Sequence, residues 1–127
     1  MSRDAAAVAR DCFTAFSDGD LAAFAAHLAP DVVGRVTGAD GGVDVLRGRD
    51  AYVARIPDLD SAEWKVEVTQ VAEVADDLAL TAVRVRAHRN DRELQNFAAF
   101  LTRVADARIT EIWMVEAEPA YSDEFWA

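Results

Sequence analysis

The sequence predicts an α+β fold in which three N-terminal helices pack on a curved, mainly antiparallel sheet. Up to Pro57, most apolar residues recur at the three-to-four-residue spacing of amphipathic helices. From Glu63 to Glu116 they instead alternate with polar residues, as half-buried strands require. Short polar turns divide this second half into consecutive strands. A curved sheet covered by helices forms a cone-shaped α+β barrel, and we expect a pocket at its open end.

Three segments of the N-terminal half carry helix signals. An apolar stripe from Ala5 to Phe16 predicts the first helix. Asp20 can cap a second helix, which carries apolar residues from Leu21 to Leu28 and which Pro30 stops. A third helix is expected at residues 48–56, directly before a proline.

The remaining segments predict strands and turns. A short strand is expected at 31–37, and the glycine-rich and aspartate-rich residues 38–45 predict a loop. Asp76-Asp77 is typical of a tight hairpin turn. The tail at 118–126 is aromatic and acidic. The long strands are expected from Glu63 to the turn at Asp76, and at 78–88, 93–104 and 108–116.

Composition limits the class of protein. A length of 127 residues suits one domain, which we place at 1–127. The formal net charge of −10 opposes binding to nucleic acid phosphates and to anionic membrane surfaces, so we expect neither partner. Cys12 is the single cysteine, so no internal disulfide can form. Without a signal-peptide pattern or a long apolar run, we expect a cytoplasmic protein.

Several short motifs resemble one family. Phe16-Ser17-Asp18-Gly19-Asp20-Leu21 and Gly48-Arg49-Asp50-Ala51-Tyr52 resemble helix junctions of ketosteroid isomerases and SnoaL-like polyketide cyclases. The strand motifs at 66–70 and 108–113 resemble strands of the same proteins, which belong to the nuclear transport factor 2-like superfamily. The resemblance spans nearly the whole chain and implies a cystatin-like cone. It does not carry function, because this fold hosts isomerases, cyclases, hydrolases and binding domains.

The catalytic positions that the resemblance implies hold the wrong residue types here. The oxyanion-hole tyrosine of ketosteroid isomerases falls on Cys12, and the protonated aspartic acid falls on Ala99. The general base falls on Val36, and the aspartate of epoxide hydrolases and cyclases falls near Met114. A thiol is a weak donor, and the other three side chains provide no acid or base. The chain is therefore not expected to be a standard ketosteroid isomerase.

Arg84 could still carry chemistry, but two interpretations of its strand conflict. The alternating pattern turns Val83, Val85 and Ala87 inward and Arg84 toward water. The register implied by the resemblance turns Arg84 into the pocket instead, where it could bind a carboxylate or enolate oxygen. That register leaves Val83 and Val85 on the outer face.

Glu116 is the second candidate catalytic residue. The register implied by the resemblance points Ile112, Met114 and Glu116 toward the pocket. A carboxylate beside Met114 and near Trp126 can have a raised pKa and act as a base. A glutamate at the exposed rim of a strand end is the alternative interpretation.

We expect the pocket to be mainly apolar and to need no cofactor. The two histidines have no recognisable metal-ligand spacing, so no metal is expected. The residues expected to line the pocket are Cys12, Phe13, Phe16, Val36, Tyr52, Arg84, Phe97, Ala99, Ile112, Met114 and Glu116.

Two functions remain open from the sequence. The first is the binding of a small apolar ligand without catalysis, which the missing catalytic residues favour. The second is an isomerase or cyclase that acts on a small apolar carbonyl compound and uses Arg84 or Glu116.

We also expect a homodimer. Val83, Val85 and the last strand, which is apolar on both faces, would leave an apolar patch on the outer face of the sheet, with Trp113 as an anchor. In the alternative, the tail at 118–126 folds back over this patch and the protein is a monomer.

Overall fold

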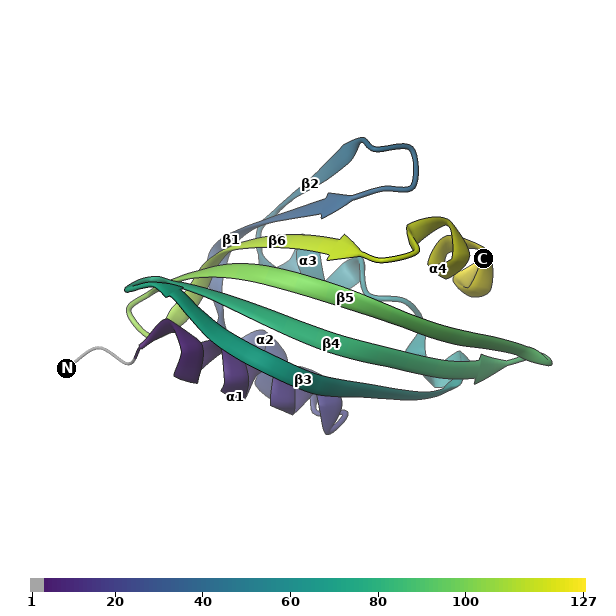
Figure 1. Cartoon of the computed structure of the whole chain (residues 1–127). Helices are drawn as coiled ribbons and strands as arrows, with labels where there is room; N and C mark the ends of the chain where they lie inside the picture. Colours follow the sequence, from purple (N-terminus) through teal and green to yellow (C-terminus); the bar gives the residue numbers. More distant parts are fainter. Residues whose placement is uncertain (1–3) are drawn as a thin grey trace.

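The computed structural model describes residues 4–127, in which one six-stranded sheet curves around three of the helices (Figure 1). The helices are α1 (Ala5–Ser17), α2 (Leu21–Ala26), α3 (Arg49–Ala54) and α4 (Pro119–Trp126), with a short 3₁₀ turn, η1, at Leu59–Ser61. The strands are β1 (Leu28–Thr37), β2 (Val43–Arg47), β3 (Glu63–Ala75), β4 (Leu78–Arg89), β5 (Arg92–Ala105) and β6 (Arg108–Glu116).

The strand order β2-β1-β6-β5-β4-β3 confirms the predicted fold class. Strands β3 to β6 form a continuous antiparallel meander, and β1 and β2 are antiparallel as well. Within the described residues, only β1 and β6 pair in parallel. This pairing joins the two strands of the first half of the chain to the meander. Helices α1 and α2 lie along the concave side of the sheet (Figure 1).

Side-chain caps fix the first two helices. The Asp4 carboxylate accepts a hydrogen bond from the backbone N–H of Ala7 at 2.7 Å, and Asp20 accepts one from Ala23 at 3.0 Å. Gly19 adopts the left-handed conformation, with a φ of 79°, between the two helices. The predicted capping role of Asp20 is therefore confirmed.

Three predicted boundaries are wrong. Helix α2 ends at Ala26, and strand β1 already begins at Leu28, so Pro30 lies within a strand instead of ending a helix. The predicted loop at 38–45 contains the start of β2, which pairs with β1. Most residues of β2 are exposed, and its short Val43-Asp44-Val45 alternation directly follows the glycines and aspartates that predict a loop. Helix α3 is also shorter than predicted.

Two bulges change which residues face inward. The pairing of β3 with β4 passes from Val68 to Gln70, so Val68 and Val71 both pack on the core although they are three residues apart. A second irregularity near Thr110 lets Ile109 and Ile112 both be fully buried. Ile109 therefore does not share a row with Trp113, as uninterrupted alternation along the strand would require. Such bulges also bend a sheet.

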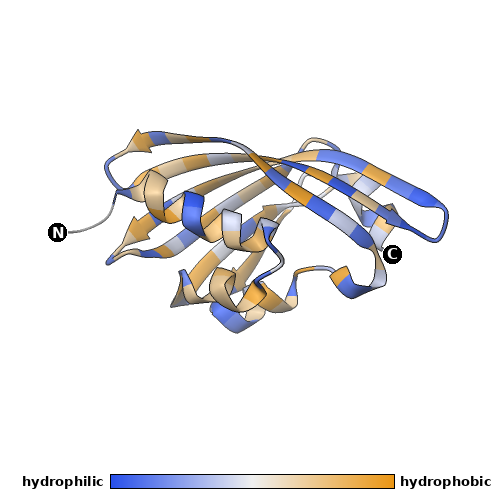
Figure 2. Cartoon of the chain, turned by 90° about the horizontal axis from the view of Figure 1, so that it is seen from below, coloured by the Kyte–Doolittle hydropathy of each residue, from blue (hydrophilic) through white to orange (hydrophobic). Residues whose placement is uncertain are grey.

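The core divides along the length of the sheet. Its main part lies under α1 and includes Val8, Cys12 and Ile112, none of which is exposed. A smaller cluster of Ala87, Leu94 and Phe125 lies at the other end, under α4. Figure 2 shows hydrophobic and hydrophilic residues alternating along the long strands. Across residues 4–127 no helix has the length and apolar character to cross a bilayer.

Candidate functional site

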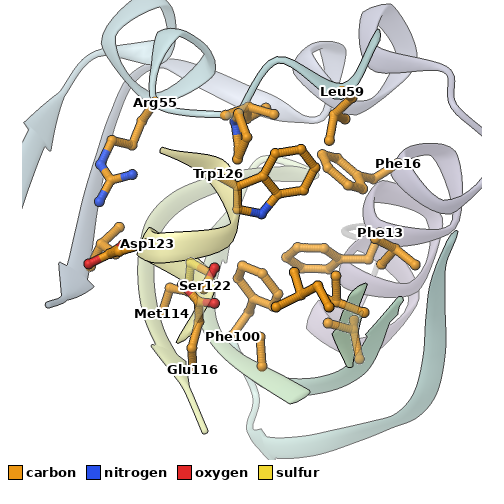
Figure 3. A pocket seen from close by; sticks show the side chains of 18 of the residues that line it. Phe13, Phe16, Arg55, Leu59, Phe100, Met114, Glu116, Ser122, Asp123 and Trp126 are labelled. Carbon is orange, nitrogen blue, oxygen red and sulfur yellow. The ribbon is translucent and has the colours of Figure 1, made fainter. Parts of the chain in front are cut away.

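A cavity of about 310 Å³ lies on the concave side of the sheet (Figure 3). A third core cluster, made of Val66, Val83 and Ala98, forms part of its wall. Helices α1, α3 and α4 and the concave face of the sheet all contribute to its wall. The lining residues are mostly apolar and comprise Phe13, Phe16, Phe24, Val36, Tyr52, Arg55, Ile56, Pro57, Leu59, Val66, Val83, Val85, Leu94, Ala98, Phe100, Met114, Glu116, Ser122, Asp123, Trp126 and Ala127.

Aromatic side chains form the deeper wall. Phe13 and Phe16 are three residues apart on α1, so both point toward the sheet. The Phe13 ring lies 4.5 Å from the Phe100 ring and 6.1 Å from the Phe24 ring, measured between centroids. The Phe16 ring lies 5.6 Å from the Trp64 ring. These contacts give the cavity a fixed, apolar floor.

Alternation along the strands decides which side chains reach the cavity. Val83 and Val85 of β4 line it, as do Ala98 and Phe100 of β5. The structure therefore follows the alternating pattern of β4 and not the register implied by the resemblance. The prediction that Val83 and Val85 lie on the outer face is wrong.

Arg84 and Phe97 lie on the outer face of the sheet, so the prediction that they line the pocket is wrong. The two residues are direct partners across β4 and β5, and the Arg84 guanidinium lies 5.7 Å from the centroid of the Phe97 ring. Phe97 is 54% exposed. Arg84 therefore cannot serve as a cationic group in this cavity.

Three other expected lining residues do not reach the cavity. Ala99 points outward between Ala98 and Phe100, so the inward positions of this strand are one residue away and are equally apolar. Cys12 and Ile112 are buried in the main core instead. Burial raises the pKa of the Cys12 thiol to about 12, and the thiol donates to the Phe24 carbonyl, so it is no nucleophile. By contrast, Phe13, Phe16, Val36, Tyr52, Met114 and Glu116 line the cavity.

Glu116 is held at the edge of the cavity by two neighbouring side chains. The side-chain amide of Asn96 donates a hydrogen bond to Oε2 of Glu116 at 3.1 Å, and Ser122 of α4 also bonds the carboxyl group. Burial raises the pKa of Glu116, and the nearby Asp123 adds to this effect. Ser122 and Arg55 oppose the shift. The balance favours a carboxyl group that holds its proton to a higher pH than an exposed glutamate does.

Asn96 is a residue that the sequence analysis missed. It is 2% exposed, and its side-chain amide makes four hydrogen bonds. Nδ2 donates to Glu116 and to the Glu118 carbonyl. Oδ1 accepts from the backbone N–H groups of Phe97 and Glu118. It thereby joins the candidate acid to the start of α4. The available signal was a polar side chain at an inward position of β5, between Leu94 and Ala98.

Helix α4 closes the end of the cavity. Phe125 packs against Ala87 and Leu94, and the Trp126 indole lies over the cavity (Figure 3). Arg89 donates to the carbonyls of Phe125 and Ala127, both at 3.3 Å, and Arg92 donates to the Glu124 carbonyl at 3.2 Å. Cations at the carboxyl end of a helix are stabilising because carbonyl groups there lack partners.

Ionisable groups gather at this same end. Arg55, the residue directly after α3, and Asp123 of α4 face one another across the cavity edge, and Glu116 and Ser122 lie beside them (Figure 3). Arg55 also forms an ion pair with Asp44 of β2 at 3.7 Å. The cavity therefore has an apolar floor and one polar end. Within the described part of the chain, no three His, Cys, Asp or Glu side chains gather closely enough to hold a metal ion.

Comparison with known proteins gives a consistent family. Residues 9–112 match the model of the SnoaL-like domain. The uncharacterized protein Rv0034 of Mycobacterium tuberculosis is 36% identical over 121 residues, which cover 93% of this chain and 92% of the relative.

Solved structures show the same fold at low identity. Bal32a, from a soil-derived mobile gene cassette, has a TM-score of 0.80 and 18% identity over 96% of this chain and 95% of its own. IdmH, a candidate polyketide cyclase from Streptomyces antibioticus, has a TM-score of 0.74 and 19% identity over 98% of this chain and all of its own. An LEH-like epoxide hydrolase of M. tuberculosis has a TM-score of 0.71 and 16% identity, over 91% of this chain and 86% of its own.

The raised pKa of Glu116 predicts a pH-dependent loss of stability. Between the ordinary glutamate pKa and the raised one, the folded protein holds a proton that the unfolded chain has released, so stability falls as pH rises. Glu116→Gln keeps an oxygen for Asn96 and stays neutral. We expect it to match the wild type near pH 4 and to melt a few degrees higher at pH 7. Thermal unfolding followed by circular dichroism between these pH values measures the difference.

A substitution of an exposed residue of α4 serves as the control. Glu124→Gln removes one exposed carboxylate from α4, and its melting curve should run parallel to that of the wild type at every pH. A Glu116→Gln variant that is less stable than the wild type at pH 7 would show that the charged carboxylate is the favoured form.

Proposed function

The chain belongs to the SnoaL-like domain family, and we propose that it binds a small, mostly apolar organic molecule in the cavity of the cone. The observation that carries this proposal is the cavity itself, about 310 Å³ in volume and lined largely by aromatic and aliphatic side chains. Small-molecule sites have volumes of about 300–1,000 Å³ and combine an apolar wall with few polar groups. The volume lies at the lower end of this range, which favours a small ligand.

The polar end of the cavity gives the bound molecule an orientation. Arg55, Glu116 and Ser122 lie on one side of the space, and the opposite wall consists of phenylalanine rings. A polar group on the ligand would meet this end, since burial against the rings would leave it without hydrogen bonds. The proposed ligand is therefore amphipathic and carries at least one oxygen.

Two neighbouring alanines provide a direct test. Ala98 lines the cavity, and Ala99 points to the outer face. We expect N-phenyl-1-naphthylamine, a neutral fluorescent probe of apolar cavities, to bind the wild type saturably, with one probe molecule per protein chain. Ala98→Phe places a ring in the cavity and should weaken binding by about tenfold or more, which corresponds to at least about 1.4 kcal/mol. Fluorescence titration measures the affinity of the wild type and of the variant for the probe.

Ala99→Phe is the matched control, because it adds the same ring to the same strand on the other face. It should bind the probe as the wild type does. Circular dichroism verifies that both variants fold, and Ala98→Leu replaces Ala98→Phe if the larger ring prevents folding. Absence of saturable binding to the wild type, or equal binding by the Ala98 and Ala99 variants, contradicts the proposal.

A second function is favoured by the state of Glu116. A carboxyl group with a raised pKa, oriented by Asn96 and placed at the edge of an apolar cavity, can exchange a proton with a ligand. We therefore propose acid–base chemistry next to a carbonyl group, as an isomerase or cyclase would perform, as the alternative. Glu116 is the group that would carry it, since Arg84 lies on the other side of the sheet.

Hydrogen–deuterium exchange tests this chemistry without knowledge of the natural substrate. In heavy water, the Glu116 carboxylate would remove a proton from the carbon beside the carbonyl of 2-tetralone. The resulting carboxyl group would exchange this proton for a deuteron of the solvent and then deliver the deuteron to the enolate. We expect the wild type to accelerate deuterium incorporation, measured by proton nuclear magnetic resonance, and Glu116→Gln to lose about a hundredfold or more of this rate. Equal rates for the two proteins would show that Glu116 does not take part in the reaction. Binding of 2-tetralone without exchange would contradict the catalytic alternative and support the binding function.

We also propose that two copies pair through the outer face of the sheet. Strand registers place Leu80, Leu101 and Trp113 in one row and Ala82, Ala99 and Val115 in the next. Phe97 adds a ring that is 54% exposed. The tail that could have covered this face packs instead as α4 against Ala87 and Leu94 on the inner side, so that expectation is wrong. A patch of this kind typically meets its own copy across a two-fold axis.

Sedimentation velocity at micromolar concentration tests the pairing. We expect a dimer of the 13.8 kDa chain, and we expect Phe97→Glu to convert it to a monomer. The substitution removes the exposed ring and places a carboxylate at the interface, where its desolvation is costly even beside Arg84. Val74→Glu is the matched control, because Val74 is equally exposed, at 54%, but lies on the edge strand β3. A wild-type monomer, or a dimer that survives Phe97→Glu, contradicts the proposal.

A further inference from the structure

Tyr52 is held rigidly against the wall of the cavity. It lies on α3, and its ring packs on the backbone of Gly34 in β1 so closely that a Cβ atom at Gly34 would lie 2.4 Å from Cδ2 of the ring. Only glycine leaves room for this contact. The ring therefore has one available position, and the position of its hydroxyl oxygen is fixed with it.

No hydrogen bond joins the Tyr52 hydroxyl to another group of residues 4–127, although the residue is only 6% exposed and lines the cavity. Its oxygen is not among the fully enclosed polar atoms, so it keeps access to the cavity. Nearly all buried hydroxyl groups in proteins make a hydrogen bond, because leaving one unmade costs free energy. Tyr121, the second tyrosine, follows this rule: its hydroxyl donates to the Glu93 carbonyl and accepts from the Gln95 backbone. Thr81 also has a hydroxyl without a partner, but it does not line the cavity.

We propose that the Tyr52 hydroxyl donates a hydrogen bond to an acceptor oxygen of the bound molecule. This inference rests on the proposed ligand-binding function and specifies the class of ligand. The hydroxyl can serve only in its protonated form, and burial raises its pKa further above that of an exposed tyrosine. It therefore remains a neutral donor throughout the physiological range.

The position of this donor constrains the ligand chemically. Tyr52 belongs to the main core cluster, whereas Glu116 and Ser122 lie at the end that α4 covers. A molecule that satisfies both ends carries a neutral acceptor, such as a ketone, ester or ether oxygen, on its inner part. A purely hydrocarbon body would fill the space and leave the Tyr52 hydroxyl unpaired.

A matched pair of ligands separates the hydrogen bond from apolar burial. Fluorenone and fluorene have the same flat ring system and differ in one carbonyl oxygen. We expect the wild type to prefer fluorenone, and Tyr52→Phe to weaken fluorenone binding by about fivefold to tenfold while changing fluorene binding by less than about twofold. Isothermal titration calorimetry measures the affinities for both ligands.

The melting temperature of the free protein gives a second readout. Tyr52→Phe keeps the ring on Gly34 and removes only the unpaired hydroxyl, so the free variant should be as stable as the wild type or more stable. Tyr121→Phe is the control: it should lower the melting temperature, because its hydroxyl bonds Glu93 and Gln95, and should leave the preference for fluorenone unchanged.

Each other outcome counts against the inference. If both ligands bind the wild type and Tyr52→Phe weakens them equally, the hydroxyl does not select the ligand. If Tyr52→Phe destabilises the free protein, the hydroxyl has a structural partner. If neither ligand nor N-phenyl-1-naphthylamine binds the wild type, the proposed function fails, and this inference fails with it.

Discussion

The cavity depends on a mismatch in length between helix α1 and the strands beneath it. A helix of 13 residues is about 20 Å long, whereas a strand of 14 residues, such as β5, extends about 46 Å. One helix therefore covers less than half of the concave face. The far end needs its own cover, which α4 supplies by packing Phe125 on Leu94. The space between the two covers is not filled by side chains and forms the cavity.

The sequence predicts the fold well because the two halves of the chain differ in hydrophobic period. The same alternation correctly turned Val83 and Val85 inward, whereas a register taken from a family resemblance turned Arg84 inward and was wrong. A shift of one residue moves every side chain of a strand to the opposite face. Bulges such as the one near Thr69 cannot be read in the same way, since threonine fits an uninterrupted strand equally well.

The candidate site is predictable only in part. Glu116 could be found because it follows Met114 at the inward spacing of β6, and Phe13 and Phe16 could be found from the stripe on α1. The roles of Asn96 and of the Tyr52 hydroxyl could not be found. The role of Asn96 depends on the start of α4, 22 residues later in the chain. The role of the Tyr52 hydroxyl depends on the absence of a hydrogen-bond partner among the described residues. Both depend on distances between elements, which no local pattern encodes.

The distribution of polar groups in the cavity follows from the cost of burying charge. Val36 lines the inner wall, and the inward positions of β5 hold Ala98 and Phe100, so this region offers no group that could carry a charge. A charge there would be expensive, because these apolar side chains provide no counter-ion. A neutral tyrosine hydroxyl avoids this cost and still directs a hydrogen bond. The ionisable groups instead lie together at the end covered by α4: Arg55, Glu116 and Asp123. There Asp123 raises the pKa of Glu116 and Arg55 lowers it. A neutral oxygen toward Tyr52 and a reactive or ionisable group toward Glu116 is the arrangement that matches this division.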